Sequence, residues 1–147
     1  MEAKKSNVAA VKIQTYTPDT MTIRSKKPDF LIKKGLWKER TLYDLYSEAY
    51  TPFEWHKDLF EYAKKIGITI FSSPFDVTAV DFLESLNVPA YKIASFENTD
   101  LELIKKVAST GKPMIISTGM ATVAEIDDAV RTARTAGCKD LIILKCT

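Results

Sequence analysis

The chain has 147 residues, of which 46% are apolar and 27% charged, and its formal net charge is +2. This composition is typical of a globular domain with a buried core, and the near-neutral balance argues against nucleic acid or an anionic membrane as a partner. No apolar run approaches the roughly 18 residues of a membrane span, and the polar first residues do not resemble a secretory signal. Cys138 and Cys146 have neither a disulfide framework nor a metal-ligand spacing, so we expect a cytoplasmic protein with reduced thiols.

Five segments have the composition of buried strands. They are residues 8–15, 68–73, 90–95, 113–118 and 141–146. Segments of helical period lie between them, and an alternation of strands and helices predicts a parallel sheet with crossover helices. The later units repeat at intervals of roughly 22–28 residues, which suits a (β/α) barrel.

Capping signals predict where the intervening helices begin and end. Three pairs have the spacing of a capping box: Thr51 with Glu54, Thr99 with Glu102, and Thr122 with Glu125. In the helix after Pro52 we expect a buried apolar stripe of Trp55, Leu59, Tyr62 and Ile66. Gly67 is expected to end that helix.

The length of the chain limits how much of a barrel it can form. A complete eight-stranded barrel needs roughly 200–250 residues, whereas five strand candidates are present here. We therefore expect an α/β fold: one incomplete (β/α) barrel domain over residues 1–147, with about five parallel strands, as an internal fragment of a larger protein. The long connection between residues 17 and 50 contains a basic run and is typical of a functional loop, although such runs are more often solvated surface.

Two lysines occur inside predicted strands, at positions where burial is expected. Lys12 lies in the first strand and Lys92 in the third. A buried ammonium without a partner costs several kcal/mol, so each lysine needs a counter-ion. Because the strands contain no Asp or Glu and Glu97 is the only acid nearby, we predict an anionic ligand such as a phosphate or carboxylate. Pairing with a buried carboxylate and a Schiff-base role for a strand lysine remain alternatives.

Hydroxyl-bearing residues follow the strands, at the ends where sites form in parallel α/β folds. They are Ser72 and Ser73, Ser95, and the Ser117-Thr118-Gly119 turn. The single histidine, His56, is expected to be structural and to lie on an outer helix away from the strand ends. No zinc, P-loop or dinucleotide-binding motif is present.

Five motifs, in this order, resemble the sialic acid synthase family, which is built on a (β/α) barrel. They are K-I-Q-T-Y-T at 12–17, F-S-S-P-F-D at 71–76, A-Y-K-I-A-S at 90–95, K-P-M-I-I-S-T-G-M at 112–120 and L-K-C-T at 144–147. The resemblance covers essentially the whole chain. The stretch G-L-W-K-E-R-T-L-Y-D-L-Y-S-E-A-Y-T-P-F-E-W-H-K, and Lys145 where sialic acid synthases tend to have His, look most like the pseudaminic acid synthase branch.

The resemblance implies a reaction and a set of site residues. Enzymes of this family condense phosphoenolpyruvate with an N-acetylated amino-sugar aldehyde, giving a nine-carbon acidic sugar and phosphate. By resemblance, the residues that contact substrate are Lys12, Ser73 and Lys92 at the phosphoenolpyruvate carboxylate, Ser95 and Ser117 at the phosphate, and Gln14, Phe75 and Tyr16 at the sugar. Glu97 matches an active-site acid and is expected to transfer a proton.

Several family features have no counterpart in this chain. The resemblance implies a divalent metal, Mn or Mg, held by two histidines on later strands, and no residue here replaces them. An acidic residue on the first strand and a C-terminal antifreeze-like domain, which completes a homodimer, are also missing. We therefore expect the fragment alone to be inactive. Two alternatives remain, a Schiff-base aldolase using Lys92 and a non-catalytic remnant that binds phosphoenolpyruvate or serves only as a scaffold.

Overall fold

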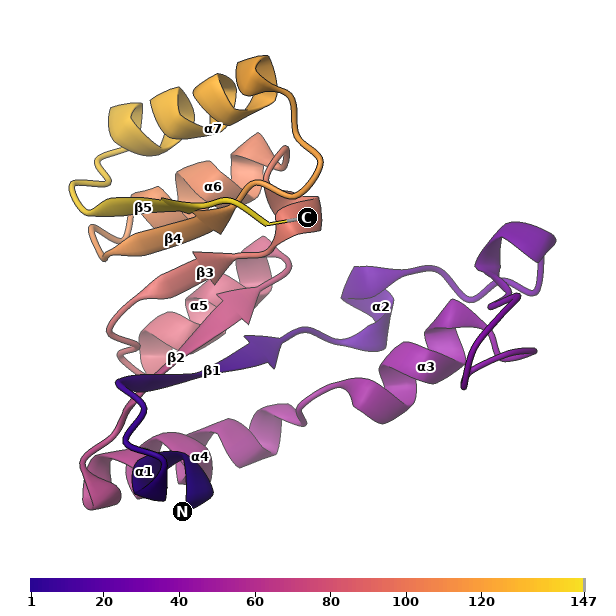
Figure 1. Cartoon of the computed structure of the whole chain (residues 1–147), viewed down its shortest axis with the longest axis horizontal. Helices are drawn as coiled ribbons and strands as arrows, with labels where there is room; N and C mark the ends of the chain where they lie inside the picture. Colours follow the sequence, from indigo (N-terminus) through magenta and orange to yellow (C-terminus); the bar gives the residue numbers. More distant parts are fainter. Residues whose placement is uncertain (147) are drawn as a thin grey trace.

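Five parallel strands form a single sheet in this computed structural model, which describes residues 1–146 (Figure 1). The strands are β1 Ala10–Thr15, β2 Thr69–Pro74, β3 Tyr91–Ile93, β4 Met114–Ser117 and β5 Leu141–Leu144. Their order in the sheet is their order in the chain and every neighbouring pair is parallel, as in a barrel wound in one direction. The predicted α/β class and all five strands are confirmed. Thr147, which ends the L-K-C-T motif, lies outside the described residues.

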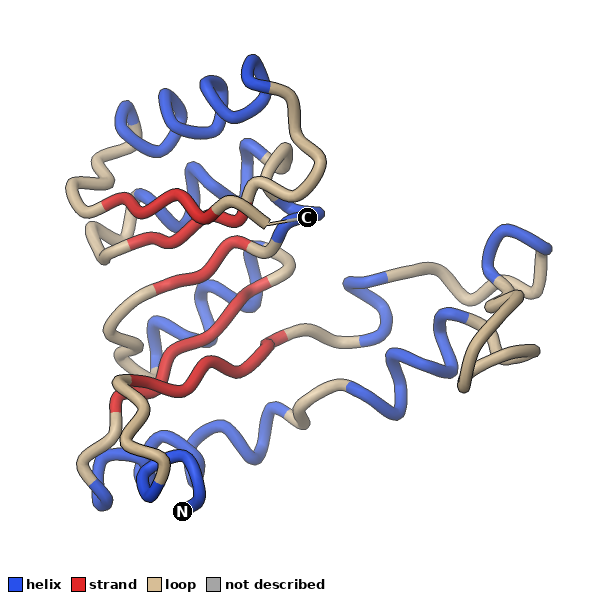
Figure 2. The backbone as a smooth tube through the Cα atoms, in the orientation of Figure 1, coloured by secondary structure: helices blue, strands red, loops and turns tan. Residues whose placement is uncertain are grey.

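Four crossover helices cover one face of this sheet (Figure 2). They are α4 Phe53–Ile66, α5 Val77–Ser85, α6 Leu101–Ala108 and α7 Val123–Thr135. The core lies between these helices and the sheet, where Leu83, Ile104 and Ile116 are almost completely buried. No helix or strand among residues 1–146 covers the other face, which in a complete barrel would be the interior.

The helix α4 differs from expectation in its start and its buried side. Its N-cap is Pro52 and no side chain caps it, so the predicted Thr51 capping box is wrong: the helix begins one residue too late for Thr51 to reach. The predicted stripe is also wrong, since Trp55 is 59% and Tyr62 43% exposed. The buried side instead includes His56 and Ala63. Gly67 ends the helix with φ of 66°, as predicted.

The other two predicted capping boxes have different outcomes. Thr122 and Glu125 form the full box at α7, with the Glu125 carboxylate accepting from Thr122 N at 2.7 Å. At α6 the cap is Asp100, whose carboxylate accepts from Leu103 N at 3.0 Å, so the prediction at Thr99 is wrong by one residue. Asp and Thr are both good caps, and the backbone turn decides which of two adjacent candidates is used.

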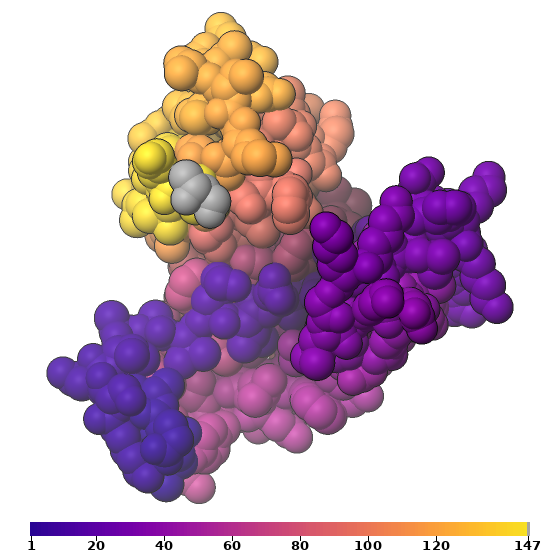
Figure 3. Space-filling view, turned by 45° about the vertical axis from the view of Figure 1, so that its right-hand side comes forward, coloured from indigo at the N-terminus to yellow at the C-terminus, as the bar shows by residue number. Residues whose placement is uncertain are grey.

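Residues 17–50, which we call the arm, leave the sheet at the carboxyl end of β1 and form a separate lobe (Figure 3). The arm contains the short helices α2 Pro18–Met21, η1 Pro28–Phe30 and α3 Leu42–Ala49. Tyr16 joins it to the sheet, with ring centroids 5.9 Å from Tyr46 and 5.3 Å from Phe75. The predicted long insertion is thus present and starts at the carboxyl end of the sheet. Its lysines are exposed, in line with a solvated surface.

Two short helices complete the described fold. The N-terminal α1 Glu2–Lys5 is tied to the sheet domain by Lys4, whose ammonium donates to Gly67 O at 2.9 Å. The 3-10 helix η2 Ser95–Glu97 follows β3 directly and begins the loop at its carboxyl end. None of the helices described here has the length and apolar character needed to cross a bilayer.

Candidate active site at the carboxyl ends of the strands

Strand alternation separates the polar residues of the sheet between its two faces. Thr15 and Tyr91 point toward the helices, because the first contacts His56 of α4 and the second contacts Glu84 of α5. Their chain neighbours Gln14 and Lys92 therefore lie on the uncovered face. The register places Gln14 beside Ser73 of β2, so both belong to that face near the carboxyl ends.

The two strand lysines share the uncovered face, as the sequence predicts. The expected burial is wrong for Lys12, which is exposed because no element among residues 1–146 covers this face, whereas Lys92 is half-buried. Lys12 lowers the pKa of Lys92 by repulsion, after the larger effect of burial, and burial also lowers the pKa of Lys12. Among residues 1–146 neither forms an ion pair with a carboxylate. Lys92 donates only to the neighbouring Ile93 O, at 2.6 Å. The alternative of a buried carboxylate as counter-ion is therefore not found in the described part of the chain.

Two further predicted residues have buried polar atoms without a partner. Ser73 Oγ and Glu97 Oε2 are both shielded from solvent, and no donor or acceptor among residues 1–146 reaches them. Burial raises the pKa of the Glu97 carboxyl, and a hydrogen bond to its own backbone and the charge of Lys92 oppose this without reversing it. Unsatisfied buried groups are rare in folded proteins and each calls for an explanation, of which a ligand is one.

A cavity of about 430 Å³ lies at the carboxyl ends of β3, β4 and β5. Ser95, Gly119 and Cys146 line it, and Ser117 is the last residue of β4 beside it. Gly119 has φ of 53°, and a Cβ at this position would lie 2.8 Å from Ser95 Cβ. The chain therefore needs glycine here to bring the two loops together. An anion in this cavity would meet the Ser95 hydroxyl and the turn at Gly119, and also the Glu125 carboxylate, which Thr122 holds at 2.7 Å.

The residues expected to face a sugar are only partly exposed to solvent. Gln14 is exposed on the uncovered face and Phe75 is half-buried at the end of β2. Tyr16 is 4% exposed because its ring lies between Phe75 and Tyr46. Its visible function is thus to hold the arm, which leaves little of its surface for a ligand. Burial, and then Tyr46, raise the pKa of its hydroxyl.

His56 is structural, as expected, but its predicted position away from the strand ends is wrong. Its side chain is fully buried and its Nε2 lies 2.8 Å from Oγ1 of Thr15, the last residue of β1. The predicted apolar stripe lies one residue out of phase with the buried side of α4, which is why the contact between His56 and the end of β1 was not expected.

The described residues do not provide a metal site. No group of three or more His, Cys, Asp and Glu among residues 1–146 is arranged to hold a metal ion, and the only histidine is engaged with Thr15 and Pro52. The residues present do not fit the divalent metal that the resemblance implies.

The sequence analysis missed two residues at this end of the sheet. Asn98 is 5% exposed and donates to Thr118 O at 2.5 Å, which ties the loop after β3 to the end of β4. Asp76 caps α5 through one carboxylate oxygen, while Oδ2 is buried without a partner among the described residues. An amide or carboxylate in a short loop after a strand is a signal that could have identified both.

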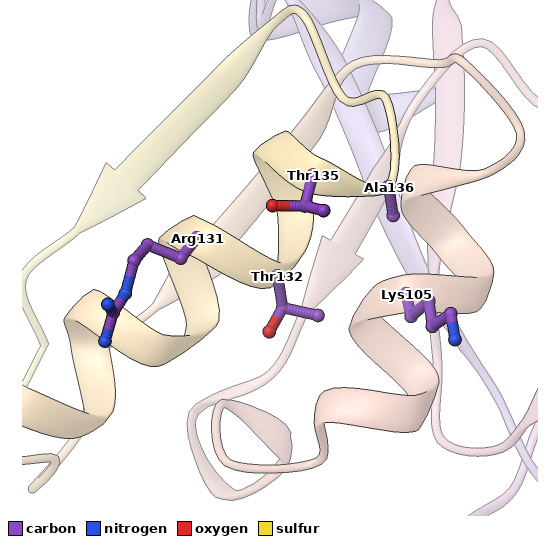
Figure 4. A pocket seen from close by; sticks show the side chains of 5 residues that line it. All are labelled: Lys105, Arg131, Thr132, Thr135 and Ala136. Carbon is purple, nitrogen blue, oxygen red and sulfur yellow. The ribbon is translucent and has the colours of Figure 1, made fainter.

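A second hollow lies far from the strand ends, on the outside of the helix layer. Its volume is about 470 Å³, and it lies between Lys105 of α6 and the last turns of α7 (Figure 4). One of its two cations, Arg131, is already paired with Asp127 and Asp128, both at 3.0 Å. None of the predicted site residues lines it, so the strand-end cavity is the better candidate.

Comparison with known proteins identifies the family of this chain. The model of the NeuB family matches residues 1–147. The chain belongs to the NeuB family. It is 52% identical over 143 residues to the pseudaminic acid synthase of Helicobacter pylori and 49% identical over 145 residues to that of Campylobacter jejuni. These matches cover 97% and 99% of this chain, in agreement with the predicted family and branch.

A solved structure shows the same NeuB architecture. A crystal structure of N-acetylneuraminic acid (sialic acid) synthetase from Leptospira borgpetersenii serovar Hardjo-bovis, in complex with citrate, superposes with a TM-score of 0.81 at 26% identity. The match covers 99% of this chain and 46% of that one. The chain spans 42% of the length of each pseudaminic acid synthase, so the activity of those whole enzymes comes to it only as a proposal.

Proposed function

We propose that this chain carries the phosphoenolpyruvate-binding part of a synthase of the pseudaminic acid type. The observation that carries the proposal is the pair Lys12 and Lys92, two ammonium groups on one uncovered sheet face, close enough to interact and without a carboxylate partner among residues 1–146. An anion with several charges relieves the cost of keeping both ionised. The citrate in the Leptospira structure is such an anion, bound by a protein of this family.

The arrangement supports separate roles for the strand-end residues. Lys12, Lys92 and the unpartnered Ser73 hydroxyl would bind the carboxylate of phosphoenolpyruvate. Ser95, which lines the cavity with Gly119, and Ser117, at the end of β4, would donate to its phosphate. Gln14, next to Ser73 in the register, and Phe75 would face the amino-sugar. Holding both reactants by fixed groups lowers the entropic part of the barrier.

Glu97 is proposed as the proton-transfer group of this reaction. The methylene carbon of phosphoenolpyruvate bonds to the aldehyde carbon, and the aldehyde oxygen becomes an alkoxide that needs a proton. Water then adds at the neighbouring carbon that bears the phosphate and loses a proton, and phosphate leaves from that carbon with carbon–oxygen cleavage. Burial raises the pKa of Glu97, so its Oε2 holds a proton at higher pH than an ordinary carboxyl and can donate it to the alkoxide.

Calorimetric titration of the chain with phosphoenolpyruvate tests the proposal. We expect saturable binding that weakens about 10- to 100-fold in Lys12→Met and in Lys92→Met, because each variant removes a charge-assisted hydrogen bond. Lys105→Met is the matched control: this lysine is exposed on the outer side of α6, and affinity should stay within about twofold. Failure of the unmutated chain to bind at millimolar concentrations, or equal affinity in all three variants, would overturn the proposal.

One observation favours a second candidate, a Schiff-base aldolase. Burial and the neighbouring Lys12 lower the pKa of Lys92, and a lowered pKa is what an amine nucleophile needs at neutral pH. Borohydride reduction in the presence of pyruvate distinguishes the two functions. A covalent adduct on Lys92 found by peptide mass spectrometry supports the aldolase, whereas an unmodified Lys92 supports the synthase.

The finer details of the whole enzyme belong to the same proposal. They are the use of Mn or Mg, the N-acetylated amino-sugar as second substrate, a homodimer, and a cytoplasmic location. The branch that includes the Helicobacter and Campylobacter pseudaminic acid synthases supports the choice of sugar. Light scattering of the purified protein measures its oligomeric state directly.

A further inference from the structure

The carboxyl ends of β1 and β2 are joined by a chain of buried side chains on the helix-covered face. Thr15, His56 and Ser72 are all fully buried. Thr15 Oγ1 lies 2.8 Å from His56 Nε2 and 2.6 Å from Ser72 Oγ, and His56 Nδ1 lies 3.0 Å from Pro52 O. Three elements, β1, β2 and α4, therefore meet at one hydroxyl.

The chemistry of these partners fixes the positions of the protons on His56 and Thr15. Pro52 O is a carbonyl and only accepts, so His56 Nδ1 must carry a proton and donate it. Burial lowers the pKa of His56 and no charged side chain opposes this, so the ring is neutral and Nε2 has a free lone pair. Nε2 then accepts from the Thr15 hydroxyl, whose single proton is thereby used. The Ser72 hydroxyl must in turn donate to Thr15, or to Ile13 O at 3.2 Å.

The side-chain bonds lie where the backbone ladder between these strands weakens. The last register pair of β1 and β2 is Thr15 with Pro74. Proline has no N–H and cannot donate to the neighbouring strand. The hydrogen bonds among Thr15, Ser72 and His56 therefore supply directional attachment between the strand ends that the backbone cannot.

The same strand ends carry two predicted site residues on the opposite face. Gln14 immediately precedes Thr15, Ser73 immediately follows Ser72, and the two are register partners. A shift of Thr15 and Ser72 on the helix-covered face also moves Gln14 and Ser73 on the uncovered face, because adjacent strand residues share one peptide unit. α4 also follows the arm directly, so His56 fixes the point at which the arm returns to the sheet.

We infer that His56 is a positioning residue. As a neutral imidazole protonated at Nδ1, it locks the carboxyl ends of β1 and β2 together from the helix-covered face, and so holds Gln14 and Ser73 in place for the ligand. The ligand part of this inference rests on the proposed function. The locking itself concerns only the chain's own atoms and is tested separately.

Nitrogen NMR of the unmutated chain tests the lock without any substitution. The chain has one histidine, so its long-range proton–nitrogen correlations need no assignment. We expect the Nδ1–H tautomer at pH 7.5 and a pKa below 6.5, the ordinary value of the side chain. An Nε2–H tautomer or an imidazolium at that pH would overturn the inference, because Thr15 could then no longer donate to the ring.

Paired variants test whether the lock acts on the site. Thr15→Val keeps the shape of the side chain and removes the hydroxyl, and we expect phosphoenolpyruvate affinity to fall about 5-fold, the equivalent of one hydrogen bond. Thr110→Val is the matched control, since Thr110 donates to Val107 O at 2.7 Å in the turn after α6, away from the site. That variant should bind as the unmutated chain does.

If His56 acted through packing alone, its variants would follow a different order of affinity for phosphoenolpyruvate. His56→Gln retains an acceptor for Thr15, whereas His56→Leu retains only bulk. We expect affinity to be partly rescued in His56→Gln relative to His56→Leu, and equal or reversed affinities would overturn the inference. If the unmutated chain binds no phosphoenolpyruvate, the proposed function fails. Amide hydrogen exchange at Gln14 and Ser73 then tests whether His56 and Thr15 hold the strand ends in place. Faster exchange in Thr15→Val than in Thr110→Val supports the lock, and equal exchange overturns it.

Discussion

The two faces of the sheet use polar residues in opposite ways. On the helix-covered face the polar side chains satisfy one another: Tyr91 donates to Glu84 at 2.6 Å and Lys112 donates to the same oxygen at 2.7 Å. On the uncovered face Lys12 and Lys92 repel each other, and Ser73 has a buried hydroxyl without a partner among residues 1–146. Tyr91 and Lys92 are adjacent residues of β3, so the two faces differ within a single strand.

This difference distinguishes residues that stabilise the fold from residues that await a ligand. A buried polar group with partners contributes to stability, whereas one without them lowers it and persists where function requires it. The covered face should therefore respond to substitution mainly in stability. The uncovered face should respond mainly in ligand binding. The following predictions test this contrast, beginning with the largest expected effect on stability.

Leu83→Ala should destabilise the fold most. Leu83 of α5 is completely buried in the core of the covered face, and truncation leaves a cavity, so we expect a loss of about 3 kcal/mol in the free energy of unfolding. Urea denaturation followed by circular dichroism measures this loss. Leu36→Ala, in the arm at 92% exposure, is the control and should change stability by less than about 0.5 kcal/mol. Similar losses in the two variants would contradict the assignment of the core.

Gly119→Ala should have the next largest effect, at the site itself. The new Cβ would lie 2.8 Å from Ser95 Cβ, and φ is already positive, so we expect a loss of about 2 kcal/mol and weaker phosphoenolpyruvate binding. Gly35→Ala separates the two causes, because Gly35 has φ of 84° and nothing within 4 Å. The control should lose only about 1 kcal/mol and keep its affinity. Equal effects in both variants would show that the contact with Ser95 does not matter.

The order and class of the elements could be predicted from the sequence, because hydrophobic period and local capping chemistry determine them. Thr122 and Glu125 form the expected box since both partners lie within one turn of backbone. The phase of α4 could not be predicted. Two apolar stripes compete on that helix, and the side that is buried includes His56, a polar residue whose partner Thr15 is 41 positions away in the chain.

The sequence singles out candidate residues for the site, but the way they are arranged could be predicted only in part. Lys12 and Lys92 stand out because a lysine is unusual in a strand of a parallel sheet. The closeness of Ser95 to Gly119 depends on how two loops meet, and the burial of Tyr16 depends on where the arm returns. Neither follows from spacing along the chain, since both are set by contacts between distant segments.

Tyr91→Phe should have a moderate effect confined to the covered face. The change removes the hydroxyl that donates to Glu84 and leaves the ring in the core, so we expect a loss of about 1.5 kcal/mol. Affinity for phosphoenolpyruvate should stay within about twofold although Lys92 is the next residue, since the two side chains point to opposite faces. Tyr62→Phe on the exposed side of α4 is the stability control. A large loss of affinity in Tyr91→Phe would show that the faces are not independent.

Glu97→Gln should have the smallest effect on stability, and that effect should depend on pH. Burial raises the pKa of Glu97 above its ordinary value of 4.5, so the folded chain holds this proton more tightly than the unfolded chain. The stabilisation is fully present below pH 4.5 and is lost as pH rises through the raised pKa. Thermal unfolding from pH 4 to pH 7.5 should therefore show the variant gaining stability relative to the unmutated chain as pH rises. Glu102→Gln, on the exposed side of α6, should show no such gain, and parallel profiles for Glu97→Gln and the unmutated chain would contradict a raised pKa.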